Sequence, residues 1–181
     1  LARGVLVVGI GRAATRKLSE VVPKEKEYVA KVCLGMTSTT DDAEGEKTTV
    51  ACARPPTEAE VRAALATFEG EISQVPPAYS AVKIRGKPAY RRARRGEALS
   101  LEPRKVFIKE IELRSYHWPD VELRVVTGPG VYIRALARDL GALLGTGGYL
   151  ADLERTRVGD FTTEEALTLD AVAAAVTGRK G

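Results

Sequence analysis

The sequence predicts an α+β fold in which a mixed, largely antiparallel sheet is flanked by helices. Segments that alternate apolar and polar residues are interspersed with segments of helical periodicity, and their order does not follow a regular strand–helix–strand repeat. With 181 residues, 44% of them hydrophobic, the chain is long enough to bury a core. This length favours one domain over residues 1–181.

The first elements are two predicted strands with a helix between them. The apolar run Val5–Ile10 predicts a buried strand, and Thr15–Val22 predicts a short helix that ends at a proline. Tyr28–Leu34 alternates in character, which predicts a second strand with one buried face.

A loop and a capped helix are predicted next. Residues 35–56 are rich in Thr, Ser, Asp and Gly and predict a loop that holds a short strand near residues 48–53. Thr57 and Glu60 have the spacing of a capping box, so a helix should begin there and end before Gly70.

The second half contains further strands and helices. Val75–Ala78 should be extended because of its prolines, and Ala89–Arg95 should be helical. Lys105–Leu113 and Val121–Val126 predict strands, and Leu169–Val176 predicts a last helix.

The most informative segment is the junction after Val121–Val126, where a Gly-Pro-Gly break leads into leucines at helical spacing. It places Tyr132 and Arg134 two residues apart. If the chain is still extended there, both side chains emerge on one side; if the helix has already begun, they diverge. On pattern alone, ordinary strand–helix packing with a surface arginine remains an alternative to a functional site.

The composition argues against several classes of protein. No apolar run approaches the roughly 20 residues that span a bilayer, so we expect an intracellular, cytoplasmic protein. Cys33, Cys52 and the single His117 are too few for a zinc site or a histidine-based nucleophilic triad, so no metal is expected. No long apolar stripe is left over, which favours a monomer.

A basic segment with aromatic neighbours predicts binding to nucleic acid. Tyr79 and Tyr90 accompany a run of seven basic residues without any acidic one. Arginines beside aromatic rings suit phosphate contacts and base stacking in single-stranded or looped RNA. A merely solvated face is the alternative. The seven residues are Lys83, Arg85, Lys87, Arg91, Arg92, Arg94 and Arg95.

Two further motifs have plainer interpretations. Gly9–Ala14 imitates a dinucleotide-binding turn, but the following strand lacks the acidic residue that such a site needs, so a tight turn is favoured. Asp41–Gly45 has three carboxylates without the alternating spacing of a calcium loop, which also favours a turn. Asp42 is a candidate for recognising a polar substrate edge.

Taken together, several collinear motifs resemble the bacterial TruB family of tRNA pseudouridine synthases, from Leu1 to about Leu169. The motifs are Tyr28 after Lys26-Glu27, Leu34-Gly35 followed by Thr37–Gly45, Gln74–Lys83, Tyr90–Gly96, Gly130–Arg134 and Leu153–Gly159. Each one is weak by itself, but their shared order and spacing are specific.

The resemblance implies a pseudouridine synthase fold and isomerisation of uridine-55 in the T arm of tRNA. The reaction needs no cofactor, and the uridine is flipped out of its loop. The implied catalytic residues are Tyr28, which would stack on the base, Tyr132, which would line the pocket, and Arg134, which would pair with a nucleophilic aspartate. The implied substrate-binding residues are Asp42, Lys83, Tyr90, Arg91, Arg94, Arg95, Leu153 and Arg155.

The chain departs from the family pattern at its start. The family's nucleophilic aspartate precedes a Leu-Ala-x-Gly-Val-Leu motif that here is Leu1–Leu6, so it should lie two residues upstream of Leu1. The N-terminal part of the fold and a C-terminal RNA-binding domain of the PUA type are also expected to be missing. Asp139 is expected to serve the helix after Arg134 rather than to replace the nucleophile.

Two alternatives follow. Without an upstream carboxylate, the protein would be a noncatalytic module that binds tRNA through the same basic surface. A guide-RNA-directed relative would need partner proteins, whereas the bacterial form of these motifs predicts tRNA as the only obligatory partner and no membrane association.

Overall fold

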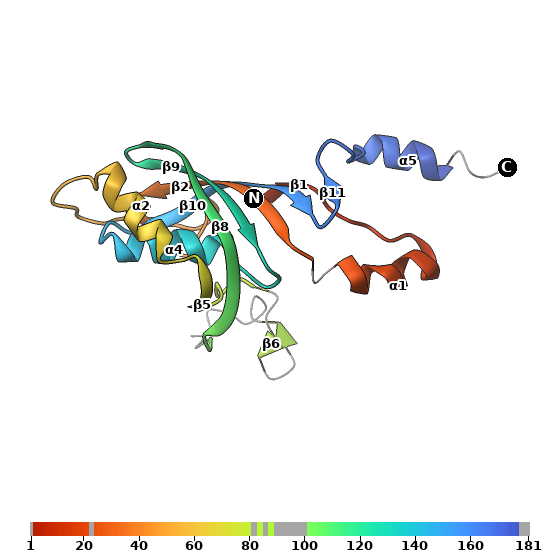
Figure 1. The fold of residues 1–181 in the computed structure, drawn as a ribbon, viewed down its shortest axis with the longest axis horizontal. Coiled ribbons are helices and arrows are strands. Elements are labelled where there is room, and N and C mark those ends of the chain that lie inside the picture. Colours follow the sequence, from red (N-terminus) through yellow and green to blue (C-terminus); the bar gives the residue numbers. More distant parts are fainter. Residues whose placement is uncertain (1, 22–23, 81–82, 85–86, 89–100, 178–181) are drawn as a thin grey trace.

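A twisted, mostly antiparallel sheet forms the frame of the molecule (Figure 1). The computed structural model describes residues 2–21, 24–80, 83–84, 87–88 and 101–177. Within them, the main sheet has the order β1-β10-β2-β9-β8-β5, with β11 paired to β10. Only the β1–β10 pair is parallel. The strands are β1 (Ala2–Gly4), β2 (Lys26–Leu34), β5 (Gly70–Gln74), β8 (Arg104–His117), β9 (Asp120–Thr127), β10 (Gly148–Val158) and β11 (Phe161–Thr162).

Helices α2 and α4 cover one face of this sheet, whereas α1 and α5 lie away from it (Figure 1). This arrangement confirms the predicted α+β class. Two small hairpins, β3–β4 and β6–β7, complete the fold. Their bounds and those of the helices are β3 (Met36–Ser38), β4 (Lys47–Thr49), β6 (Lys83–Ile84), β7 (Lys87–Pro88), α1 (Gly11–Val21), α2 (Glu58–Ala66), α4 (Ile133–Leu143) and α5 (Leu169–Thr177).

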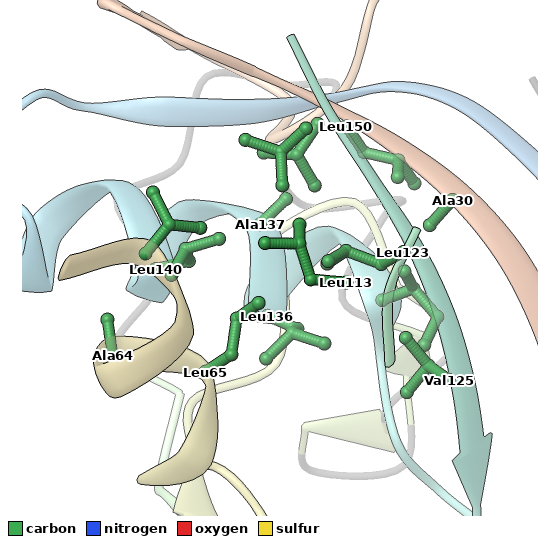
Figure 2. Close-up of a cluster of buried hydrophobic side chains, with 14 of the residues drawn as sticks. Ala30, Ala64, Leu65, Leu113, Leu123, Val125, Leu136, Ala137, Leu140 and Leu150 are labelled. Carbon is green, nitrogen blue, oxygen red and sulfur yellow. The ribbon is translucent and has the colours of Figure 1, made fainter. Parts of the chain in front are cut away.

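The core lies between the sheet and the helices α2 and α4 (Figure 2). The alternation in β2 buries one side of the strand, as the sequence predicted, because successive side chains of a strand point to opposite faces. Leu123 from β9, Leu136 and Leu140 from α4, and Leu150 from β10 are at most 1% exposed. Burying one such side chain contributes about 1.5–3 kcal/mol.

The predicted capping box of α2 is present. The Thr57 hydroxyl accepts a hydrogen bond from the Glu60 amide, and the Glu60 carboxylate accepts one from the Thr57 amide at 2.7 Å. These contacts satisfy backbone donors that the first turn of a helix cannot pair internally. The helix ends at Ala66, and Gly70 instead begins β5, with a positive φ of 91°.

The prediction of a buried strand over Val5–Ile10 is wrong. The strand is Ala2–Gly4, and residues 5–10 have no regular structure. Leu6, Val8 and Ile10 are 62–73% exposed. Hydrophobic character alone does not supply a neighbouring strand, and within the described ranges these residues pair with none.

Other differences concern further strands. The sequence did not predict β3, β5 or β10, and the short strand of the 35–56 loop lies at Lys47–Thr49 rather than near residues 48–53. The predicted helix Ala89–Arg95 lies outside the described residues. No helix in the described part of the chain is long and apolar enough to cross a membrane.

Helix α4 lies unusually close to the turn that leads into β10. A Cβ atom at Gly141 would lie 2.2 Å from the backbone of Gly147 and Gly148, so only glycine fits there. Glycine lowers helix stability by about 1 kcal/mol relative to alanine, and here it permits close packing. The contact fixes α4 against β10, and the site described next lies between these elements.

Candidate active site

Five of the predicted site residues line one pocket of about 420 Å³. They are Tyr28, Tyr132, Arg134, Leu153 and Arg155. The pocket lies where β1, β2 and β10 meet the start of α4, and β1 contributes Ala2, Arg3 and Gly4 to its wall. Its volume is in the range of small-molecule sites, which is about 300–1,000 Å³. Residues far apart in the sequence are thus brought together in one pocket, and their roles there stay predictions.

Tyr28 is the most buried aromatic side chain of the pocket. It is 9% exposed and lies on β2, opposite Arg155 of β10 and Val125 of β9. Burial raises the pKa of the Tyr28 hydroxyl above its ordinary value of 10.0, and the charge of Arg155 opposes part of this shift. The side chain therefore stays neutral at physiological pH and offers an aromatic ring and a hydroxyl donor.

Tyr132 and Arg134 lie on either side of the helix start. Tyr132 is the N-cap of α4, with extended φ and ψ of −104° and 111°, and Arg134 is the second residue of the helix. The helix has thus begun between them, yet both side chains line the same pocket. Tyr132 makes no side-chain capping bond, so its ring is not used to close the helix end.

Arg134 is held by three acceptors from two distant loops. Its guanidinium donates to the Asp42 carboxylate at 3.0 Å, to the Thr40 carbonyl at 3.3 Å and to the Tyr79 carbonyl at 2.7 Å. A cation in the first turn opposes the positive end of the helix dipole, and the first turn of α4 has no acidic residue. The Asp42 side chain, 6% exposed, therefore compensates a charge that the helix alone would disfavour.

A second ion pair lies one turn farther along α4. Arg138 donates to the Asp41 carboxylate at 2.9 Å, and also to Asp139 and to the Val75 carbonyl. Burial raises the pKa of Asp41 above its ordinary range, although the charge of Arg138 opposes the shift. Arg134 and Arg138 together fasten the β3–β4 hairpin to α4. Asp139 contacts Arg138, in keeping with a role in the helix rather than as a nucleophile.

Arg155 fixes the chain where it leaves β1. Its Nε donates to the Val5 carbonyl at 2.8 Å, and its own carbonyl accepts from the Val5 amide at 2.8 Å. Gly4 has a positive φ of 97°, and a Cβ atom there would lie 2.2 Å from the Arg155 carbonyl oxygen. The exit of β1 therefore requires glycine, and Arg155 joins it to the pocket.

The remaining predicted residues are outside this pocket or outside the described chain. Asp42, 4% exposed as a whole residue, does not line the pocket but pairs with the Arg134 guanidinium, which does. Lys83 lies in β6, of which only the backbone is described. Tyr90, Arg91, Arg94 and Arg95 fall outside the described residues, so their roles stay predictions. Among the described residues, no group of three His, Cys, Asp or Glu side chains could hold a metal ion.

Sequence reasoning assigned no role to two residues that shape this region. Gln74 is 1% exposed and contacts the backbone of Tyr132, and Arg138 binds Asp41. Gln74 is the first residue of the Gln74–Lys83 motif, but nothing in that motif indicated a contact with Tyr132. A second pocket, of about 450 Å³, lies near the C-terminal end of α4 and contains none of the predicted site residues.

Comparison with known proteins identifies the family. Residues 1–133 match the description "TruB family pseudouridylate synthase (N terminal domain)". The chain belongs to the TruB family. Residues 134–180 match "tRNA pseudouridylate synthase B C-terminal domain". The boundary between the two matches falls at the start of α4, although β10, in the second, pairs with β1 and β2 of the first. The predicted single domain remains a prediction.

Curated relatives of this chain in bacteria carry the name tRNA pseudouridine synthase B. The Thermobifida fusca (strain YX) protein is 49% identical over 98% of this chain and 63% of its own length. The Arthrobacter sp. (strain FB24) protein is 45% identical over 96% of this chain and 58% of its own length. The chain thus spans about three-fifths of the relatives it matches.

Two solved structures have a similar fold. A chain in "Crystal Structure of a Cbf5-Nop10-Gar1 Complex" gives a TM-score of 0.63 at 30% identity, over 87% of this chain and 37% of that one. A chain in "Structure of H/ACA RNP bound to a substrate RNA containing 2'-deoxyuridine" gives 0.58 at 27% identity, over 86% and 35%. These likenesses agree with the predicted fold.

Proposed function

We propose that the protein isomerises uridine-55 in the T arm of tRNA to pseudouridine. The observation that carries the proposal is the pocket that combines Tyr28, Tyr132 and Arg134 in a chain of the TruB family. The names of the bacterial relatives support tRNA as the substrate.

The pocket suits one flipped nucleotide. Extruding a base costs a few kcal/mol of stacking and pairing, and contacts inside the pocket must offset this cost. The aromatic rings of Tyr28 and Tyr132 offer stacking surfaces, which contribute about 1–3 kcal/mol per base. Arg155 and the neutral Tyr28 hydroxyl supply hydrogen-bond donors for a polar edge of the base.

The chemistry requires a nucleophilic carboxylate, which we expect two residues upstream of Leu1. Strand β1 already lines the pocket through Ala2 and Arg3. Arg134 would favour the ionised form of that carboxylate, because an opposite charge within a few ångströms offsets desolvation. In the isomerisation, the bond from C1′ of the ribose to N1 of uracil breaks and a bond from C1′ to C5 forms. The C5 proton is released and N1 takes up a proton, so the product is an isomer of the substrate.

The rest of the substrate would be held by the basic segment. We propose that Lys83, Arg91, Arg94 and Arg95 contact RNA phosphates and that Tyr90 stacks on a base, in keeping with their residue types. Asp42 holds Arg134, and we keep a contact of Asp42 with the RNA as a further proposal. We also infer a cytoplasmic, monomeric enzyme that needs no protein partner.

A tritium-release assay tests the function. The complete natural protein is incubated with a T-arm stem–loop RNA that carries [5-³H]uridine at position 55, and with a matched RNA labelled at another uridine. We expect tritium release from the first RNA only. Binding without release would favour the noncatalytic module, and release only after partner proteins and a guide RNA are added would favour the guide-directed alternative.

A further inference from the structure

Gln74, the last residue of β5, binds both backbone polar groups of Tyr132. Its Oε1 accepts a hydrogen bond from the Tyr132 amide at 2.9 Å, and its Nε2 donates to the Tyr132 carbonyl at 3.2 Å. The two residues are 58 positions apart in the sequence. Gln74 is 1% exposed, so a lost bond there could not be replaced easily by water.

The orientation of the Gln74 amide follows from its partners. A backbone N–H can only donate and a backbone carbonyl can only accept, so Oε1 must face the Tyr132 amide and Nε2 its carbonyl. The pair of bonds resembles one rung of an antiparallel ladder, made here by a side chain. It holds the extended backbone of Tyr132 at the point where the chain turns into α4.

The segment after Gln74 contacts the first two turns of α4. Its Val75 carbonyl accepts from Arg138, and its Tyr79 carbonyl accepts from Arg134. Those two acceptors are exposed or half-buried backbone groups near charged side chains, whereas Gln74 is the buried member of the set. Tyr132 makes no side-chain capping bond, so Gln74 provides a capping contact from another element.

We propose that Gln74 is a positioning residue that sets the Tyr132 ring and the Arg134 guanidinium in the pocket. It does not line the pocket itself and acts through the backbone of Tyr132. The effect on the reaction follows because a displacement of about 1 Å at a reacting centre can lower a rate by about 100-fold. This inference rests on the proposed pseudouridine synthase function.

The test compares chemistry with RNA binding in the complete natural protein. Gln74→Met keeps the length of the side chain but removes both hydrogen bonds, and Gln74→Glu keeps an acceptor for the Tyr132 amide but removes the donor. We expect Gln74→Met to lower the single-turnover rate of tritium release from the T-arm RNA by about 10-fold or more. The Kd for the RNA should stay within about threefold, because the proposed phosphate contacts are untouched.

Thr146→Val is the matched control, because Thr146 is a fully buried polar residue at the other end of α4. Its hydroxyl donates to the Gly147 carbonyl at 2.9 Å. We expect this variant to lose thermal stability but to keep the wild-type rate within about twofold.

Each result bears on one claim only. A Gln74→Met rate within twofold of wild type would overturn the positioning role. The role would also be overturned if Thr146→Val and Gln74→Met lost the same amount of Tm and the same amount of rate. If Gln74→Met does not unfold cooperatively, Gln74→Glu decides by the same criteria. An inactive wild-type protein would instead contradict the proposed function and would leave no rate for the variants to change.

Discussion

At the scale of single residues, the site depends on an arginine in an unfavourable place. Arg134 lies in the first turn of α4, where the helix dipole disfavours a cation. The fold stabilises it there with the Asp42 carboxylate and two carbonyl acceptors. These contacts keep the guanidinium at the wall of the pocket, and the catalytic role proposed for it is tested by substitution.

The first prediction concerns Arg134→Ala. We expect the single-turnover rate on T-arm RNA to fall on the order of 100-fold or more, as for other groups that stabilise charge in a closed site. The Kd for the RNA should change by less than about threefold, because Arg134 is one of several contacts. Both constants are measured with the complete natural protein, by tritium release and by filter binding.

Arg138→Ala is the control for that prediction. Arg138 also pairs with an aspartate of the 36–49 hairpin and also donates to a carbonyl of the segment after β5, but it does not line the pocket. Its removal should loosen the hairpin and keep most of the rate. If both variants lose rate equally, fastening of the hairpin explains the effect and the pocket role of Arg134 is wrong.

Candidate site residues could be predicted from the sequence where a local pattern marked them. Tyr132 and Arg134 stood out because an aromatic and a cation follow a glycine–proline break. Gln74 and Asp41 lie in the motifs Gln74–Lys83 and Asp41–Gly45, but their contacts could not be predicted, because their partners Tyr132 and Arg138 are 58 and 97 positions away. A local motif does not show which distant residue its side chains contact.

At the scale of elements, the start of α2 links stability to pH. A hydrogen bond from Arg54 and further bonds from Thr57 lower the pKa of Glu60 from 4.5 to about 2. The ionised carboxylate is therefore favoured in the folded state. The stabilisation is complete above the unfolded pKa of 4.5 and is lost as pH falls toward 2.

We therefore predict that Glu60→Gln flattens the pH dependence of stability. Urea unfolding at pH 7, 4.5 and 3 should show a smaller fall in the free energy of unfolding for the variant than for wild type, mainly below pH 4.5. All other carboxylates titrate in both proteins, so their contribution cancels when the free energies of unfolding of variant and wild type are subtracted. Arg54→Gln should act in the same direction, and parallel curves for wild type and both variants would contradict the assignment.

Elements could be predicted from the sequence when their signals were local. The α2 capping box spans four residues and was found, and β2 was found by its alternation. By contrast, β10 has mostly half-buried residues and bulges against β2, so its sequence shows no regular alternation. Val5–Ile10 had the apolar character of a strand but forms no ladder with any strand of the described ranges.

At the scale of the whole molecule, basic residues of the sheet have acidic partners close in space, whereas one basic segment has no acidic residue in its sequence. On the sheet, Arg124 pairs with Glu27 and Glu110, and Arg157 lies within 4.0 Å of Glu25 and Glu27. The segment from Lys83 to Arg95 has seven basic residues and no acidic one in its sequence. With a net charge of only +4, RNA binding should depend on this segment rather than on the overall charge.

The last prediction is a steep salt dependence of RNA affinity that this segment produces. If four of its cations contact phosphates, the slope of log K against log salt should be about −3, which is roughly a 50-fold loss of affinity between 50 and 200 mM salt. Replacing Arg91, Arg94 and Arg95 by Gln should reduce the slope by about 2. Lys105→Gln, an exposed cation paired with Glu71 on the sheet, should leave it unchanged. Equal slopes for wild type and the triple variant would place the phosphate contacts elsewhere, and a slope near zero for wild type would remove the electrostatic basis of binding altogether.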